Sequence, residues 1–125
     1  MSKKEITSMK DIQQMVDTFY DKVDQDDLLG PIFNDFAKVD WDSHLEIMYK
    51  FWGSMVFPEA SYKGNPFNKH MPLPIESKHF DRWLELFLSN LDLQFFGDNA
   101  DLFKERSKSI ALIFDYKLKA LKNED

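Results

Sequence analysis

Hydrophobic residues recur along most of this chain with the three-to-four-residue spacing of amphipathic helices. The first stripe ends near Gly30 and Pro31, two residues that favour the end of a helix. Its members are Ile12, Met15, Val16, Phe19, Tyr20 and Val23; three further stripes run from Trp41 to Val56, from Phe80 to Leu91 and from Phe103 to Leu121. No segment alternates apolar and polar residues for long enough to predict a sheet, so the pattern predicts an all-α fold.

The segments between these stripes differ in character. Pro31–Phe33 is predicted to be a short turn, and the Lys-rich start of the chain is predicted to be frayed. Phe57–Ile75 contains four of the five prolines, so it can form at most one or two helical turns. A long loop of this kind inside a compact domain is usually functional, and its apolar residues predict that it packs against the helices.

Length and charge limit the classes of protein that this chain can belong to. Its 125 residues predict one domain over residues 1–125. The net charge of −6 argues against a nucleic-acid partner, and no apolar run is long enough for membrane insertion. The absence of cysteine excludes disulfides, thiolate metal sites and cysteine nucleophiles. With no signal-peptide pattern at the start, we expect a soluble, cytoplasmic protein.

Three metal-binding motifs are partly present in the sequence, and none of them is complete. Glu76-Ser77-Lys78-His79 matches half of a di-iron site, but the second copy is missing. His44-Leu45-Glu46 matches part of a zinc deaminase signature without its cysteines. The acidic run from Asp21 to Asp27 has neither the glycine nor the terminal glutamate of a calcium loop. His79 is predicted to cap the helix that follows or to face solvent.

One constellation remains, made of two histidines and the aromatic residues that surround them. His44 lies on the apolar face of the second helix, and His70 lies 26 residues later in the proline-rich loop. Tyr20 and Trp83 also fall on apolar faces, where a phenol and an indole need hydrogen-bond partners. A flat, hydrophobic, iron-bearing cofactor between the helices would explain this pattern. A helical bundle whose aromatic side chains simply fill its core is the alternative.

The order and spacing of these residues resemble the truncated haemoglobins, specifically their third group. The resemblance covers about residues 10–120. It rests on Phe19-Tyr20-x-x-Val23, Asp27-Leu28-Leu29-Gly30-Pro31-Ile32-Phe33, Trp41-x-x-His44, Phe51-Trp52-x-x-Met55, Tyr62-x-Gly64-x-Pro66-x-x-x-His70 and His79-Phe80-x-x-Trp83-Leu84-x-Leu86-Phe87. The family fold is a two-over-two α-helical sandwich around a b-type haem, with a loop in place of much of the helix that carries the iron ligand.

The resemblance also implies roles for single residues. His70 corresponds to the residue that ligates the haem iron. Tyr20, His44 and Trp83 correspond to the opposite, distal side, where Tyr20 and Trp83 would donate hydrogen bonds to a bound gas. His44 would gate entry, donate a hydrogen bond or bind the iron itself. The remaining cofactor contacts would come from Phe33, Phe51, Trp52 and Tyr62, and the haem propionates would bind Tyr62, Lys63, Lys69 or Arg82.

The implied function is binding of dioxygen, nitric oxide or carbon monoxide. Strong distal donors argue against bulk oxygen transport, and favour nitric oxide detoxification or peroxidase-like chemistry. The resemblance does not decide whether the chain is an enzyme. Either reaction needs an electron donor. That donor would be a separate molecule, because the chain has no glycine-rich nucleotide loop. The chain would be a monomer or a weak homodimer. The alternative function is a haem-free, globin-like sensor or interaction domain.

Overall fold

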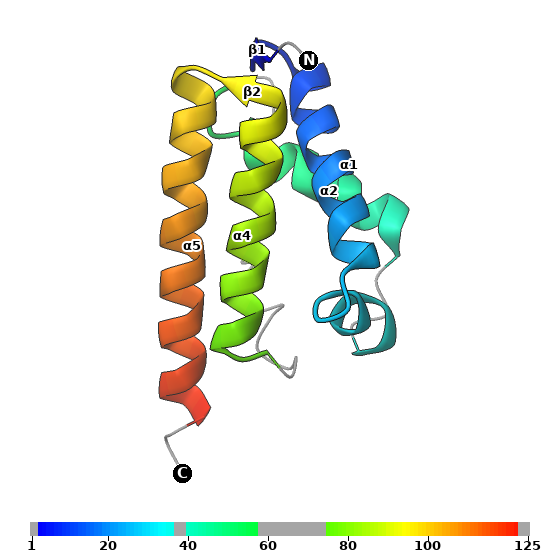
Figure 1. Cartoon of the computed structure of the whole chain (residues 1–125), viewed down its shortest axis with the longest axis vertical. Coiled ribbons are helices and arrows are strands. Elements are labelled where there is room, and N and C mark those ends of the chain that lie inside the picture. Colours follow the sequence, from blue (N-terminus) through cyan, green and yellow to red (C-terminus); the bar gives the residue numbers. More distant parts are fainter. Residues whose placement is uncertain (1–2, 37–39, 58–74, 123–125) are drawn as a thin grey trace.

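A computed structural model of the chain describes residues 3–36, 40–57 and 75–122, which are mostly helical. Within these ranges lie α1 (Met9–Gln25), η1 (a π-helix, Ile32–Phe36), α2 (Trp41–Gly53), α4 (Ser77–Gln94) and α5 (Asp98–Lys122) (Figure 1). Two short strands, β1 (Lys4–Glu5) and β2 (Phe95–Phe96), complete the described elements. The predicted all-α class is therefore confirmed.

The helices form two pairs that meet along α1 and α4. Helices α4 and α5 run antiparallel, side by side, and are joined through β2 (Figure 1). Helix α1 contacts both α2 and α4, and so it links the two pairs. The side chain of Asn90, fully buried on α4, donates a hydrogen bond of 3.0 Å to the backbone oxygen of Met15 on α1. This bond satisfies a polar group that would otherwise be costly to bury.

Aromatic rings from α1, α2, α4 and α5 form the centre of the core. The ring of Trp52 stacks on that of Phe87 at a centroid distance of 4.7 Å and meets the edge of Phe103 at 5.4 Å. Phe19 meets Phe87 edge-on at 5.0 Å. Offset-stacked and edge-to-face pairs are the arrangements that aromatic quadrupoles favour. The helical stripes predicted from the sequence therefore converge in one interior.

The start of the chain differs from the prediction of a frayed terminus. β1 pairs in parallel with β2, and Ile6 beside it is 2% exposed. The Lys4 ammonium lies 2.9 Å from the Asp11 carboxylate, and the Asn99 side-chain amide donates to the Ile6 carbonyl. The prediction failed because the partners of this segment are residues near position 95 and beyond, which a local pattern cannot reveal. The prediction that no segment forms a sheet was wrong for the same reason.

Helix boundaries differ from the predicted stripes by about one turn, except that α5 begins at Asp98, five residues before its stripe. Helix α2 ends at Gly53, and residues 54–56 form a turn with short-range bonds such as Val56 N–H to the Gly53 carbonyl. Helix α4 begins at Ser77 because Glu76 and His79 form a capping box, in which the Glu76 N–H donates to His79 Nδ1 at 2.9 Å. His79 is therefore buried and caps α4. Of the two roles predicted for it, capping the helix is confirmed and facing solvent is not. Two of the three residues of the turn predicted at Pro31–Phe33 belong instead to the π-helix η1, which begins at Ile32.

Gly30 lies where the chain leaves α1 and turns toward η1. A Cβ atom at this position would lie 2.7 Å from the backbone oxygen of Asp24, an atom that cannot move without shifting the end of α1. We expect Gly30→Ala to lower the free energy of unfolding by roughly 1–3 kcal/mol, measured as a lower urea midpoint. Ser109→Ala, at an exposed helical position, is the control and should change stability by less than about 0.5 kcal/mol. Equal midpoints for the two variants would contradict this reading.

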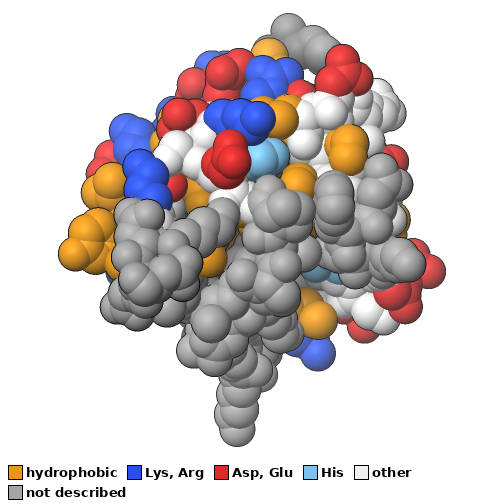
Figure 2. Space-filling view, turned by 90° about the horizontal axis from the view of Figure 1, so that it is seen from below, with side chains coloured by type: hydrophobic (Ala, Val, Ile, Leu, Met, Phe, Trp, Pro, Cys, Tyr) orange, Lys and Arg blue, Asp and Glu red, His pale blue; other side chains and the backbone are white. Residues whose placement is uncertain are grey.

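The surface carries charged side chains of both signs, with hydrophobic side chains among them on the side where α5 lies (Figure 2). None of the helices in the described ranges has the length and apolar run that a bilayer crossing requires.

Candidate functional site

Tyr20 is the centre of a cluster of aromatic rings contributed by α1, η1 and α2. The phenol is 6% exposed. Its ring meets the His44 imidazole edge-on at 4.9 Å and the Phe33 ring at 5.9 Å. Trp41 lies 5.9 Å from the same phenol ring. An edge-to-face cage of this kind holds Tyr20 in one orientation and shields its hydroxyl from water.

Trp83 joins this cluster from α4 and donates its indole N–H to the Tyr20 hydroxyl oxygen. Indole is only a donor, so the direction of this bond is fixed, and the hydroxyl proton of Tyr20 is left to be donated elsewhere. Burial raises the pKa of Tyr20 far above its usual value, and the Trp83 bond offsets only part of this shift. Tyr20 therefore stays a protonated donor through the neutral and alkaline range.

Packing fixes Trp83 in this position. Its ring is nearly parallel to that of Phe87, at an interplanar angle of 8° and a centroid distance of 5.4 Å. It meets Phe19 edge-on at 5.8 Å. Because the rings of Phe19 and Phe87 are themselves buried in the core, the indole has little freedom to turn. The donor that faces Tyr20 is thus preorganised.

His44 lies in the first turn of α2, where its backbone N–H bonds to the Asp40 carbonyl at 2.9 Å. Its ring meets Phe33 at 5.8 Å and Trp41 at 5.9 Å as well as Tyr20, and its Nε2 atom is buried. Trp41 stacks on Phe33 at 5.6 Å and donates its indole N–H to Asn34 at 3.0 Å. These contacts join η1 to α2 and set the position of the imidazole.

Asp26 and Arg82 connect the end of α1 to α4, one residue before Trp83. Arg82 Nε donates to Asp26 Oδ1 at 2.7 Å, and the backbone N–H groups of Leu28 and Leu29 donate to Asp26 Oδ2. Burial alone would raise the pKa of Asp26, but these hydrogen bonds and the Arg82 charge outweigh it and lower that pKa. Arg82 also donates to Glu85. The guanidinium expected as a possible propionate partner is therefore already bonded to two carboxylates of its own chain. Sequence reasoning missed this pair, because its members are 56 residues apart.

The lowered pKa of Asp26 leads to a prediction about acid stability. A carboxylate whose pKa is lower in the folded chain stabilises the fold above its ordinary value of 3.8, and this contribution disappears as pH falls through the folded pKa. We expect Asp26→Asn to lose roughly 1–2 kcal/mol of stability at pH 7, and the difference from wild type to shrink as pH falls below 3.8. Urea unfolding at a series of pH values measures both. Glu85→Gln is the control, because Glu85 is an exposed partner of the same Arg82 and should have little effect. A constant difference between Asp26→Asn and wild type at all pH values would contradict the argument.

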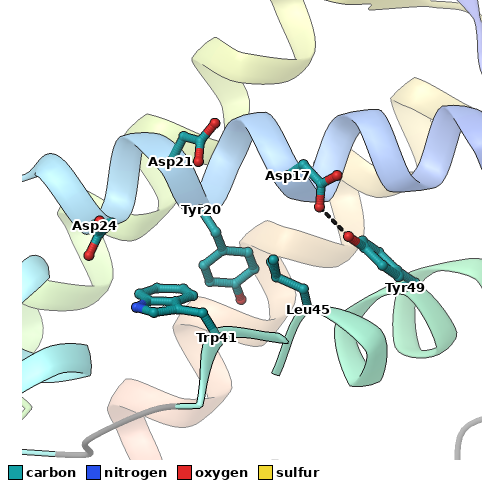
Figure 3. A pocket seen from close by; sticks show the side chains of 7 residues that line it. All are labelled: Asp17, Tyr20, Asp21, Asp24, Trp41, Leu45 and Tyr49. Atoms are coloured by element: carbon teal, nitrogen blue, oxygen red, sulfur yellow. Dashed lines mark hydrogen bonds between the residues drawn. The ribbon is translucent and has the colours of Figure 1, made fainter. Parts of the chain in front are cut away.

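A groove of about 360 Å³ lies between α1 and α2, next to Tyr20 (Figure 3). Tyr49 closes one end by donating its hydroxyl to Asp17, and burial followed by the Asp17 bond raises the pKa of Tyr49 to about 12. Carboxylates on the wall would repel the propionates of a haem, so we do not assign this groove to a haem. The lining residues are Asp17, Tyr20, Asp21, Asp24, Trp41, Leu45 and Tyr49.

The structure brings together four of the residues singled out in the sequence: Tyr20, Phe33, His44 and Trp83. Phe51 is half-buried and packs edge-on against Trp52, which lies in the central core. His70, Tyr62, Lys63 and Lys69 lie outside the described residues. Within the described ranges, no three His, Cys, Asp or Glu side chains are grouped as they would be to hold a metal ion.

The role of Trp41 was not predicted. Its signal in the sequence was its position three residues before His44, on the same face of α2.

Three comparisons with known proteins agree with one another. The family model described as bacterial-like globin matches residues 4–112. A curated relative, the group 3 truncated hemoglobin ctb of Campylobacter jejuni, is 32% identical over 114 residues, or 88% of this chain and 90% of the relative. The crystal structure of group III truncated hemoglobin from Campylobacter jejuni matches with a TM-score of 0.83 and 32% identity, over 94% of this chain and 95% of that chain. The range matched by the family model includes Tyr20, His44 and Trp83.

Proposed function

We propose, from the premise that this chain belongs to the bacterial-like globin family, that it is a b-type haem protein that binds dioxygen, nitric oxide and carbon monoxide. The predicted group and the truncated globin fold are confirmed by the matches, and family membership implies haem-based binding of diatomic ligands. The observation that best supports the finer proposal is the hydrogen bond from Trp83 to Tyr20 inside an aromatic cage.

The residues of the cluster fit a haem pocket in their chemistry. A haem is flat and apolar over most of its surface, and Phe33 on η1 and Trp41 on α2 supply aromatic surface. The distal side of a haem needs donors in a dry environment, and the buried Tyr20 hydroxyl is such a donor. The resemblance assigns the iron ligand to His70. We propose that His70 binds the haem iron.

When bound, the haem supplies an iron atom whose open position takes a diatomic gas. Tyr20 is the primary donor toward that gas, because its oxygen already accepts the Trp83 N–H and its proton is free to be donated. Trp83 acts through Tyr20 by polarising the hydroxyl, and the two bonds in series strengthen each other in a medium of low dielectric constant. His44 lies against Tyr20 and would control the approach of ligands to it.

Tight binding of dioxygen favours reaction over transport. We propose that the chain supports conversion of nitric oxide to nitrate or peroxidase-like chemistry, each with a separate protein as the electron donor. A donor protein is needed because no glycine-rich nucleotide loop is present in the sequence. A cytoplasmic location and a single domain over residues 1–125 complete the proposal. The absence of cysteine supports the location, since disulfides are typical of secreted domains.

Spectroscopy of the haem-loaded, reduced chain tests this function. We expect a Soret band that shifts when carbon monoxide or dioxygen is added, and a slow dioxygen dissociation rate in stopped-flow experiments. A purified chain that stays colourless after haem is supplied would instead support the alternative of a haem-free, globin-like interaction domain. A chain that binds haem but releases dioxygen rapidly would overturn the role given to Tyr20.

A further inference from the structure

The outward face of α5 exposes large hydrophobic side chains near the middle of the helix. Leu112 is 72% exposed, Tyr116 74% and Ile113 47%. The opposite face of α5, which includes Ala111 and Leu118, is buried against Ile75 and Phe80. Scattered apolar residues on a surface are common, but three within five positions on one helix form a contiguous patch of the kind that marks an interaction site. Figure 2 shows hydrophobic side chains at the surface on the α5 side.

Charged residues on the same face are arranged in a definite order. Positions 105, 109, 112, 116 and 119 are separated by four, three, four and three residues, so they lie along one stripe of the helix. Glu105 lies seven residues before Leu112, and Lys119 lies seven residues after it. The stripe is therefore acidic toward the start of α5, apolar in the middle and basic toward the end.

This order makes the stripe complementary to itself when two copies of α5 run antiparallel. A two-fold axis near Leu112 places Glu105 of each copy opposite Lys119 of the other, and it packs the apolar centres together. A parallel arrangement would instead place like charges in contact. Within one chain, Glu105 lies 3.6 Å from Lys108 and Lys119 lies 3.4 Å from Asp115. The Glu105 and Lys119 side chains are both exposed, so these weak pairs can exchange for contacts with another copy.

We propose that α5 is a homodimer interface, in which the stripe from Glu105 to Lys119 packs antiparallel against the same stripe of a second copy. The patch is small, so the association belongs to the weak class of interfaces. Tyr20, His44 and Trp83 lie on α1, α2 and α4, so the dimer leaves the ligand site uncovered. The proposal specifies the surface and geometry of a dimer, and it stands independently of whether the chain acts on nitric oxide or peroxide.

Sedimentation of the full, haem-loaded chain tests the proposal. Between about 10 and 1,000 μM, the average mass is expected to rise from 14.8 kDa toward twice that value. Leu112→Asp with Tyr116→Asp should abolish this rise. Leu93→Asp, at another exposed leucine, should not. A wild-type chain that stays monomeric, or a dimer that survives the double aspartate change, overturns the interface.

A charge exchange tests the antiparallel geometry. Glu105→Lys and Lys119→Glu should each weaken the dimer about tenfold, because each places like charges opposite one another. The combination of both should restore the wild-type affinity. Failure of the combination, with both single variants weakened, overturns the pairing.

Oxidative cross-linking tests the position of the axis. The chain has no cysteine, so Leu112→Cys introduces a single thiol near the axis and should form a covalent dimer rapidly on oxidation. Leu93→Cys is the matched control and should cross-link at least about tenfold more slowly. Equal rates for the two variants would overturn the proposed register.

Discussion

Replacing His70 by alanine is expected to abolish stable retention of haem by this chain. Removal of groups that only support a metal ligand costs roughly 10–100-fold in metal affinity, and loss of the ligand itself should cost at least as much. The haem-loaded variant should lose its Soret band on gel filtration, whereas wild type keeps it. Added imidazole should restore the band, because it can occupy the position of the missing side chain. Absorbance at the Soret maximum before and after gel filtration, with and without imidazole, measures both effects.

His44→Leu is the matched control for this prediction. It removes a histidine from the opposite side of the proposed haem, where His44 packs against Tyr20 and Phe33. The variant should keep the haem and change only the spectrum of any form in which six ligands bind the iron. Loss of haem from His44→Leu and retention by His70→Ala would mean that the two sides of the iron have been assigned in reverse. Retention by both variants would remove His70 from the role of ligand.

Tyr20→Phe is expected to raise the rate of dioxygen dissociation by roughly 5- to 150-fold, which corresponds to the loss of a hydrogen bond worth about 1–3 kcal/mol. The ring remains and keeps its contacts with Phe33 and His44, so the change isolates the hydroxyl group. Stopped-flow measurement of dioxygen release from the reduced, haem-loaded variant gives the rate. Tyr49→Phe is the control, because it removes a phenol hydroxyl that bonds to Asp17. Its dissociation rate should stay within about twofold of wild type.

Trp83→Phe should also accelerate release, but less than Tyr20→Phe does. In the structure Trp83 donates to Tyr20, so its loss weakens the donor without removing it. The double variant should depart from the product of the two single effects, since the two residues belong to one chain of hydrogen bonds. Unchanged rates in both single variants would discard the hydrogen-bond account. Strictly multiplicative effects would mean that the two residues act independently.

The sequence was most informative where structure depends on neighbours along the chain. The period of apolar residues from Ile12 to Val23 predicted α1, because the buried face of a helix carries an apolar residue at every third or fourth position. The capping role of His79 followed from its place at the start of α4. The family resemblance brought Tyr20, His44 and Trp83 into one site, and the structure places these three side chains in one cluster. The role of His70 is still a prediction, because the described residues do not include it.

The sequence by itself thus determined the helices, their apolar faces and the family to which the chain belongs. Only the tertiary structure decided which polar groups meet across those faces. The Trp83 bond to Tyr20, the Asp26 pair with Arg82 and the strand pairing of Lys4 with Phe95 each join residues more than fifty positions apart. Helical periodicity shows that a side chain faces inward, but it carries no information about the partner there. The partner depends on how helices cross and on which rings fill the space between them.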